Sequence, residues 1–200
     1  RTRCVADLSG YRKLDEVPYN FLRKRLSILV ATPTTHLLIT KGAVEPMLTV
    51  CTSAELPDGT TVPIGERSKE IQRQFQDLNR QGLRTLGLTY RDMGEAPHID
   101  KTHEAAMTFL GLLVFADPIR SDVTDTITAL RQLGVSLKII TGDHRLVAAH
   151  VSQQVGMDHQ RILTGQDLRQ MADEALLQRV NDIDVFAEVE PNQKDRIILA

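Results

Sequence analysis

The sequence has 200 residues, 42% of them hydrophobic, which is enough to bury one good core or two modest ones. Its 24 Lys and Arg residues nearly balance 26 Asp and Glu residues, and no basic tract stands out, so we expect no nucleic-acid partner. The longest apolar run, residues 107–116, is too short to span a bilayer as a helix. Cys4 and Cys51 lie far apart without a CxxC spacing, which indicates neither a disulfide framework nor a thiolate metal site.

The first half of the sequence predicts an antiparallel sheet with flanking helices. Two apolar runs, residues 26–30 and 36–40, lie on either side of a Thr-Pro-Thr-Thr breaker and predict a β-hairpin. A short helix is predicted over residues 43–51. From Glu66 onward, Ile71 and Phe75 recur at helical spacing ahead of Gly82, which predicts an amphipathic helix. Residues 83–90 then predict another strand, and residues 91–106 predict a connection.

From residue 107 the pattern changes to alternating strands and helices. Residues 108–115 are almost continuously apolar, as in a strand covered on both faces. Helices are predicted over residues 122–133 and 144–155, with a buried strand over residues 135–140 between them. Further elements are a helix over residues 167–179, a short strand over residues 184–187 and a helix from Pro191. This alternation predicts a parallel sheet with right-handed crossovers, and hence two domains, residues 1–106 and 107–200.

Polar residues follow two of the predicted parallel strands. Thr141, Gly142 and Asp143 come directly after residues 135–140, where backbone N–H groups and the dipole of the next helix favour a phosphate. Asp117 follows the preceding strand, and parallel neighbours would bring it to the same edge as Asp143. Two carboxylates there could hold Mg²⁺ or orient a phosphorylated side chain. Each of these features alone fits a turn or a helix cap equally well.

The first half offers a second candidate site, for a nucleotide. Lys41 ends a hairpin strand, where it could reach a phosphate or lie against adenine, and Gly42 would allow close approach. Phe21 could stack on a base, and arginines would attract phosphates. Singly, Phe21 also fits a core position and Arg84 a surface position. Lys194, early in the last helix, could face a phosphate or be a solvated lysine.

Taken in order, these segments resemble the motifs of P-type cation-transporting ATPases. They are Phe21-Leu-Arg-Lys-Arg25, Lys41-Gly-Ala43, Gly82-Leu-Arg84, Asp117-Pro118, Thr141-Gly-Asp143 and Ala187-Glu-Val-Glu-Pro-Asn-Gln-Lys194. The resemblance covers nearly the whole chain and is weakest over residues 1–14. It implies an α/β chain that comprises most of an antiparallel-sheet nucleotide-binding domain and the middle of a haloacid-dehalogenase-like phosphorylation domain. Residues 15–25, 78–84 and 186–194 look most like the bacterial magnesium importers, although calcium and proton pumps share the scheme.

The resemblance also implies which residues act. The residues that bind ATP with its Mg²⁺ would be Phe21, Arg25, Lys41, Gly42 and Arg84. Phe21 would stack on adenine, and Arg84 would contact the phosphates. Those for phosphoryl transfer would be Asp117, Thr141, Gly142, Asp143 and Lys194. Among these, Thr141 and Asp143 would act around an aspartyl phosphate, Asp117 would fix their loop, and Lys194 would neutralise the phosphoryl group. No protein metal ligand is predicted.

Some expected features depart from the family pattern. Ile119 replaces the second proline usual after Asp117, and Glu188 stands where many relatives have an arginine. The motifs Asp-Lys-Thr-Gly-Thr and Gly-Asp-Gly-x-Asn-Asp do not occur in the 200 residues. Because the chain also begins without methionine and ends on apolar residues of a helix, we expect a piece of a longer protein. The phosphorylated aspartate would lie upstream, and this piece would at most bind ATP.

On this interpretation the whole protein couples ATP hydrolysis to the movement of a cation, Mg²⁺, across a bacterial inner membrane. This chain would lie on the cytoplasmic face and work with an actuator domain and transmembrane helices of the same polypeptide. Three alternatives stay open: a calcium or proton pump, a soluble haloacid-dehalogenase-type phosphatase with a cap domain, and a noncatalytic nucleotide-binding module. The phosphatase would need its own aspartate nucleophile before the cap, whereas the module would bind ATP through residues 15–90 alone.

Overall fold

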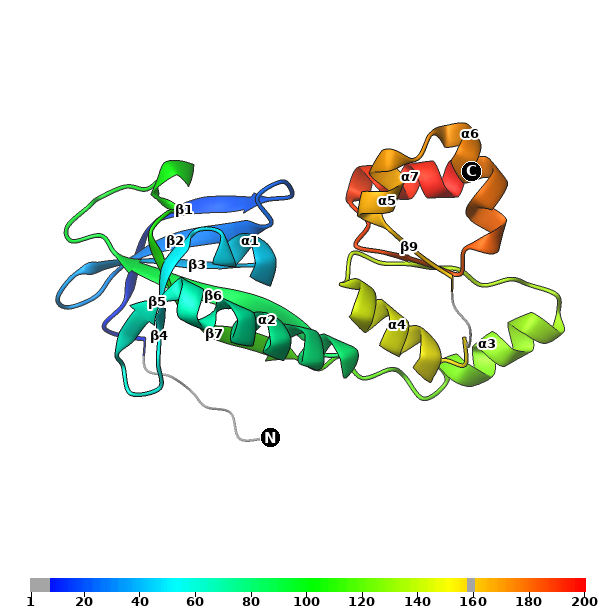
Figure 1. Ribbon diagram of the computed structural model, residues 1–200, viewed down its shortest axis with the longest axis horizontal. Helices are drawn as coiled ribbons and strands as arrows, with labels where there is room; N and C mark the ends of the chain where they lie inside the picture. The colour runs from blue at the N-terminus through cyan, green and yellow to red at the C-terminus, as the bar shows by residue number, and fades with distance from the viewer. Residues whose placement is uncertain (1–7, 158–160) are drawn as a thin grey trace. The chain divides into compact units, whose positions relative to one another are not determined.

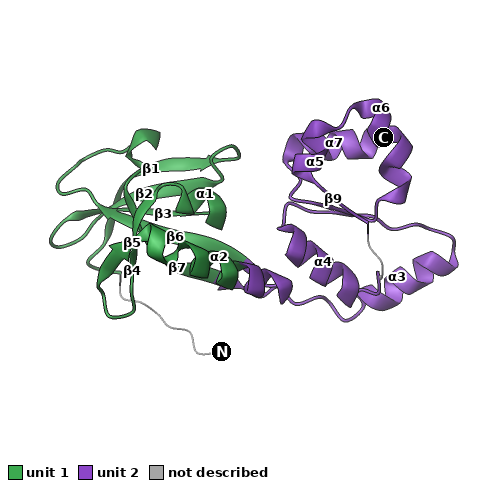
Figure 2. Cartoon of the chain, in the orientation of Figure 1, with its two compact units in different colours: residues 1–75, 85–113 green, residues 76–84, 114–200 purple. Residues whose placement is uncertain are grey.

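The computed structural model describes residues 8–157 and 161–200, which form two compact units (Figures 1 and 2). The first unit comprises the described residues up to Phe75 together with Thr85–Leu113. The second comprises Gln76–Arg84 and the described part of Val114–Ala200. None of the helices in these described ranges has the length and apolar character needed to cross a bilayer.

A seven-stranded sheet makes up most of the first unit. In spatial order its strands are β1 (Arg12–Asn20), β2 (Arg25–Ala31), β3 (His36–Gly42), β6 (Arg84–Asp92), β7 (Met107–Phe115), β4 (Cys51–Glu55) and β5 (Thr61–Pro63). The pairs β1–β2, β2–β3, β3–β6 and β4–β5 are antiparallel, whereas β4 and β7 are parallel. The predicted mixed α/β class with a largely antiparallel sheet is therefore confirmed for this part, including the hairpin β2–β3.

The core of the first unit lies between this sheet and the helices α1 (Val44–Leu48) and α2 (Ile64–Arg80). Ile71 and Phe75 are one helical turn apart on α2, so one stripe of this otherwise polar helix is buried. They belong to the same buried cluster as Leu29 and Leu38, which face each other across β2 and β3. A short 3-10 helix, η1 (Lys101–His103), precedes β7.

The second unit is built on three short parallel strands. Their order is β8 (Ile139–Ile140), β10 (Val185–Ala187) and β9 (Ile162–Thr164). Its helices are α3 (Val123–Gln132), α4 (Arg145–Gln154), α5 (Gly165–Gln170), α6 (Asp173–Arg179), the 3-10 helix η2 (Val180–Asp182) and α7 (Pro191–Leu199). Phe186 on the middle strand is fully buried in a cluster with Leu168 and Leu176. Parallel pairing is what the alternation of strands and helices predicts.

Four predicted elements need correction. The buried strand predicted over residues 135–140 is only Ile139–Ile140, and both of these residues are half-buried. Residues 108–115 were expected to open the parallel sheet, but β7 belongs to the seven-stranded sheet and pairs with β4. It is not covered on both faces either, because Phe109 is 4% exposed and its neighbour Leu110 45%. The predicted helix over 43–51 ends at Leu48, since Cys51 opens β4. The predicted helix over 167–179 is two helices, α5 and α6, because Met171 adopts extended backbone between them.

Candidate functional site

The turn between β1 and β2 holds an exposed aromatic side chain in a defined conformation. The Asn20 side-chain oxygen accepts the backbone N–H groups of Leu22 and Arg23 at 2.9 and 3.0 Å. Lys24, with a left-handed φ of 52°, donates its N–H to the Asn20 carbonyl at 2.7 Å. Phe21 nevertheless remains 56% exposed, and the edge of one ring of the Tyr19–Phe21 pair meets the face of the other. An exposed ring on an ordered turn is suited to stacking against a flat ligand.

The segment Lys41–Ala43 lies directly beside this turn. The register of β2 with β3 places Gly42 opposite Arg25, and the Lys24 carbonyl accepts the Ala43 N–H at 2.9 Å. A Cβ atom at position 42 would lie 2.5 Å from both the Arg25 Cβ and the Lys24 carbonyl oxygen, so only glycine fits here. Lys41 itself is exposed. The structure thus brings Phe21, Lys41 and Gly42, all predicted for the nucleotide, to one end of the sheet.

Arg25 and Lys41 lie on opposite faces of the sheet. Side chains alternate along a strand, so Arg25 shares the covered face with the core residue Leu29. Lys41 pairs with Leu26 and therefore belongs to the other face. The Arg25 Nε donates to Glu104 at 2.8 Å, and the Arg25 side chain is only 13% exposed. Arg25, predicted to contact ATP, is therefore engaged by a protein carboxylate on the side away from Lys41.

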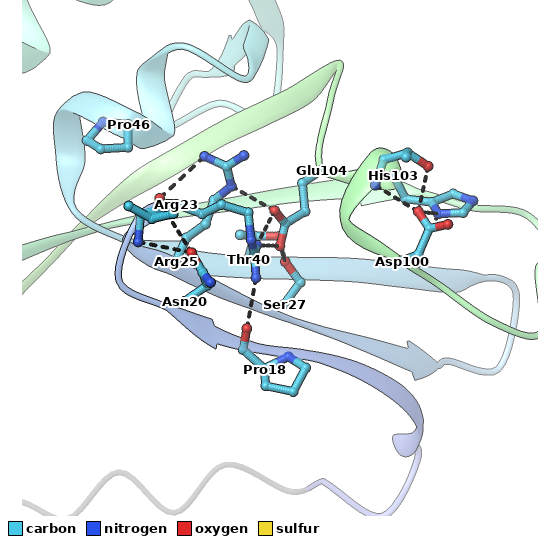
Figure 3. A network of polar contacts seen from close by, with 12 residues as sticks. Pro18, Asn20, Arg23, Arg25, Ser27, Thr40, Pro46, Asp100, His103 and Glu104 are labelled. Atoms are coloured by element: carbon cyan, nitrogen blue, oxygen red, sulfur yellow. Dashed lines mark hydrogen bonds and ion pairs between the residues drawn. The ribbon is translucent and has the colours of Figure 1, made fainter.

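Glu104 is the centre of a buried polar network on this covered face (Figure 3). Its fully buried carboxylate accepts hydrogen bonds from Arg23, from Arg25 and, at 2.7 Å, from the Ser27 hydroxyl. Ser27 is in turn hydrogen-bonded to Thr40 at 2.8 Å. Burial alone would raise the pKa of Glu104, but the hydrogen bonds from Arg23, Ser27 and Arg25 outweigh it and hold the pKa below its ordinary value. No sequence pattern indicated this residue, which falls in a stretch predicted only as a connection.

In the second unit, the turn Thr141–Asp143 follows the carboxyl end of β8, as predicted. The Thr141 hydroxyl donates to the Asp143 carboxylate at 2.9 Å and accepts the Asp143 N–H at 3.1 Å. The turn is also joined to the segment after β10, since the Val189 N–H donates to the Thr141 carbonyl and the Glu188 N–H to the Asp143 carbonyl. These contacts fix the turn at the edge of the sheet where ligands bind in open α/β folds.

Asp117 and Asp143 both lie near the guanidinium group of Arg84. The Arg84 Nε is 2.8 Å from an Asp143 oxygen, and its Nη1 is 3.8 Å from an Asp117 oxygen. The two carboxylates predicted to meet at one edge thus share one cation. Arg84 was predicted for the ATP phosphates and is here paired with acids. Within residues 8–157 and 161–200, no group of three or more His, Cys, Asp or Glu side chains could hold a metal ion.

The amino end of α4 is occupied by protein acceptors. A Glu188 carboxylate oxygen accepts the Arg145 N–H at 3.0 Å, and the His144 Nδ1 accepts the Leu146 N–H at 3.2 Å. Two of the N–H groups that the sequence offers to a phosphate are therefore already satisfied. Glu188, which was singled out as a departure from the expected pattern, has this capping role, with a left-handed φ of 56°. Lys194 is exposed in the first turn of α7, and in the described chain no hydrogen bond or ion pair joins it to Thr141–Asp143.

Comparison with known families decides what these features belong to. Residues 6–122, more than half of the chain, match the family described as P-type ATPase, cytoplasmic domain N. The chain belongs to the P-type ATPase family. The N-domain match contains the whole seven-stranded sheet, including β7, together with the Phe21 turn and Lys41–Gly42.

Similar P-type ATPases carry the names of cation transporters. The magnesium-transporting ATPase, P-type 1, of Salmonella typhimurium (strain 14028s) is 34% identical over 198 residues, which are 96% of this chain and 22% of that protein. The protein of the same name from Escherichia coli (strain K12) is 34% identical over 95% of this chain and 21% of its own length. Calcium-transporting ATPase 1 of Bacillus cereus is 29% identical over 95% of this chain and 22% of its own length. This chain thus spans about a fifth of the length of these relatives. The resemblance inferred from the motifs is confirmed, with magnesium transporters more similar than calcium transporters.

Proposed function

We propose that the first unit binds ATP, with adenine stacked on Phe21 and with Lys41 and Gly42 lining the pocket. The observation that carries this proposal is the hydrogen-bonded contact between the Phe21 turn and Lys41–Ala43 in a chain of the N-domain family. An exposed ring held by its own turn loses little freedom on binding, and the exposed lysine of the neighbouring segment offers positive charge for a phosphate. Arg84 is counted with the second unit, so its contact with the ATP phosphates stays a prediction.

For the second unit we propose part of a haloacid-dehalogenase-like phosphorylation domain. The support is the short parallel sheet with Thr141–Asp143 at the carboxyl end of β8. In addition, the carboxylates of Asp117 and Asp143 both lie near the Arg84 guanidinium. The phosphoryl group would be surrounded by Thr141, Gly142 and Asp143, whose loop Asp117 would fix. Lys194 would offset the negative charge of the phosphoryl group. Carboxylate and hydroxyl oxygens are ligands suited to Mg²⁺, which would lower the charge of the transferred phosphate.

In the full-length protein we propose phosphoryl transfer from MgATP to an aspartate outside these 200 residues, coupled to transport of Mg²⁺. The chain would then lie on the cytoplasmic face of a bacterial inner membrane and move against an actuator domain and transmembrane helices. The higher identity to proteins named magnesium transporters than to a calcium transporter supports Mg²⁺ as the ion. Uptake of Mg²⁺, measured in cells that express the full-length protein and lack other importers, tests this; uptake of Ca²⁺ instead would assign the alternative.

Nucleotide binding is tested by titrating the purified chain with MgATP and following backbone amide resonances. We expect saturable binding that weakens several-fold in Lys41→Ala and about tenfold in Phe21→Leu, since stacking of a base on an aromatic ring contributes about 1–3 kcal/mol. Lys69→Ala is the matched control, because Lys69 is an exposed lysine on α2. A folded chain that does not bind ATP, or Lys41 and Phe21 variants that bind as tightly as Lys69→Ala, would contradict the proposal.

A further inference from the structure

We infer that Glu104 is a positioning residue for ATP binding: by holding Arg23 and Arg25 from the covered face of the sheet, it fixes the turn that presents Phe21. The inference rests on the nucleotide site proposed above. Glu104 does not line that site, because its strand partners Arg25 and Ser27 lie on the face opposite Lys41. Its effect on ATP would therefore pass through the conformation of the turn.

The network anchors the turn on both sides. Before the turn, Arg23 connects Glu104 to β1, since its Nη2 donates to the Pro18 carbonyl at 2.8 Å. After the turn, Arg25 donates Nε to the same carboxylate and directs Nη1 to the Arg23 carbonyl at 3.5 Å. One carboxylate thus holds the end of β1, the turn itself and the start of β2 (Figure 3).

Stability of the fold alone does not require this charged group. The same sheet face is apolar a few residues further along, at Leu29 and Leu38, and apolar side chains of similar size often replace a buried ion pair without loss of stability. What charged hydrogen bonds add is direction, because a carboxylate accepts guanidinium groups only in defined geometries. Such direction matters beside Phe21, whose ring is 56% exposed and is itself in an edge-to-face pair with Tyr19 of β1.

The test compares ATP affinity with stability in a charge-balanced variant. Glu104→Gln alone leaves two half-buried guanidinium groups facing a neutral partner, so we combine it with Arg25→Gln, which restores the net single positive charge of the cluster. We expect the combined variant to bind ATP about tenfold more weakly than the unmodified chain, as when about one molecule in ten holds the binding conformation. Glu55→Gln is the matched control, since the Glu55 carboxylate accepts a hydrogen bond from Tyr90 on another part of the sheet.

A second readout separates positioning from general stability. If Glu104 positions Phe21, then Phe21→Leu should weaken ATP binding about tenfold in the unmodified chain and less than twofold in the combined variant, because the ring is no longer held there. If Glu104 contributed to stability alone, Phe21→Leu would weaken ATP binding by the same factor in the combined variant as in the unmodified chain. Unchanged ATP affinity in the combined variant, or the same factor for Phe21→Leu in both, would overturn the inference while leaving the nucleotide site in place.

If the combined variant does not fold, Glu104→Asp gives the same test, because it keeps the charge but is one methylene too short to reach both arginines; wild-type affinity in that variant would overturn the inference. If the unmodified chain does not bind ATP, the proposed nucleotide site itself is wrong, and the inference falls with it.

Discussion

Replacing Gly42 with alanine would force apart the two segments that make up the proposed nucleotide site. The added Cβ would lie 2.5 Å from the Arg25 Cβ and from the Lys24 carbonyl oxygen, and 2.9 Å from the Arg25 Cα. Carbon atoms pack best at about 3.5–4.0 Å, so β2 and β3 would have to separate by about 1 Å at this end. None of these three atoms can move by a side-chain rotation, because each is a backbone atom or a Cβ.

The cost of this separation can be estimated from its parts. Overpacking of a well-packed position costs about 1–3 kcal/mol, and weakening the bond from the Ala43 N–H to the Lys24 carbonyl adds about 1 kcal/mol. Without strain, a change from glycine to alanine would stabilise the chain by about 0.4–1 kcal/mol. We therefore expect the free energy of unfolding of the first unit to fall by about 2–3 kcal/mol. For a unit of about 100 residues this corresponds to a decrease in Tm of at least about 8 °C.

The assay is thermal unfolding followed by far-ultraviolet circular dichroism, fitted to two transitions because the chain has two compact units. Gly111→Ala is the control: Gly111 lies on β7, and no atom lies within 4 Å of where its Cβ would be. That variant should unfold within about 2 °C of the unmodified chain, since unhindered surface substitutions change stability by about 0.5 kcal/mol or less. A Gly42→Ala variant as stable as Gly111→Ala would show that the turn and β3 do not pack as described.

Three other perturbations probe separate parts of the chain. The hydroxyl and backbone N–H of Thr102 hold the pKa of Asp100 at about 2, so the stabilising contribution of Asp100 is present above about pH 4 and is lost as the pH falls through 2. An NMR titration should show this low pKa, and Thr102→Val should raise it. Burial raises the pKa of the Cys51 thiol to about 12, so iodoacetamide at pH 8 should alkylate Cys51 only after unfolding, as mass spectrometry of that peptide would reveal. Phe186→Ala should lower the stability of the second unit by about 3–5 kcal/mol, measured from its urea transition.

Elements with a long apolar run or a strong apolar period could be predicted from the sequence, and short or polar ones could not. The hairpin β2–β3 was indicated by two apolar runs on either side of a breaker, and the helix α2 by an apolar period of about 3.6. Strand β1 was missed because it lies at the edge of the sheet, is mostly exposed and contains Pro18. Strands β5 and β9 have only three residues each, too few to show a period. A continuous apolar run such as β7 indicates a strand but not the sheet to which it belongs.

The same limit applies to the sites. The neighbourhood of Phe21 and Lys41 follows from the hairpin, because pairing β2 with β3 must bring the start of one to the end of the other. Glu104 is 77 residues from Ser27, and no local pattern distinguishes it from other charged residues in the connection before β7. Asp117 and Asp143 do lie close to one cation, but not as ends of adjacent parallel strands, since β7 pairs outside the parallel sheet.

Gly42 and Glu104 act on the same turn by different means, and this difference allows preorganisation to be distinguished from stability. Gly42 permits the turn to lie against β3, whereas Glu104 holds its arginines from the covered face. Gly42→Ala should be strongly destabilising and the charge-balanced Glu104 variant only weakly so. Both should nevertheless remove most of the effect of Phe21→Leu on ATP affinity, because in either variant the ring is no longer held in place. If the strongly destabilised variant lost this coupling and the weakly destabilised variant kept it, the coupling would depend on stability. The rigidity of the turn would then not contribute to ATP binding.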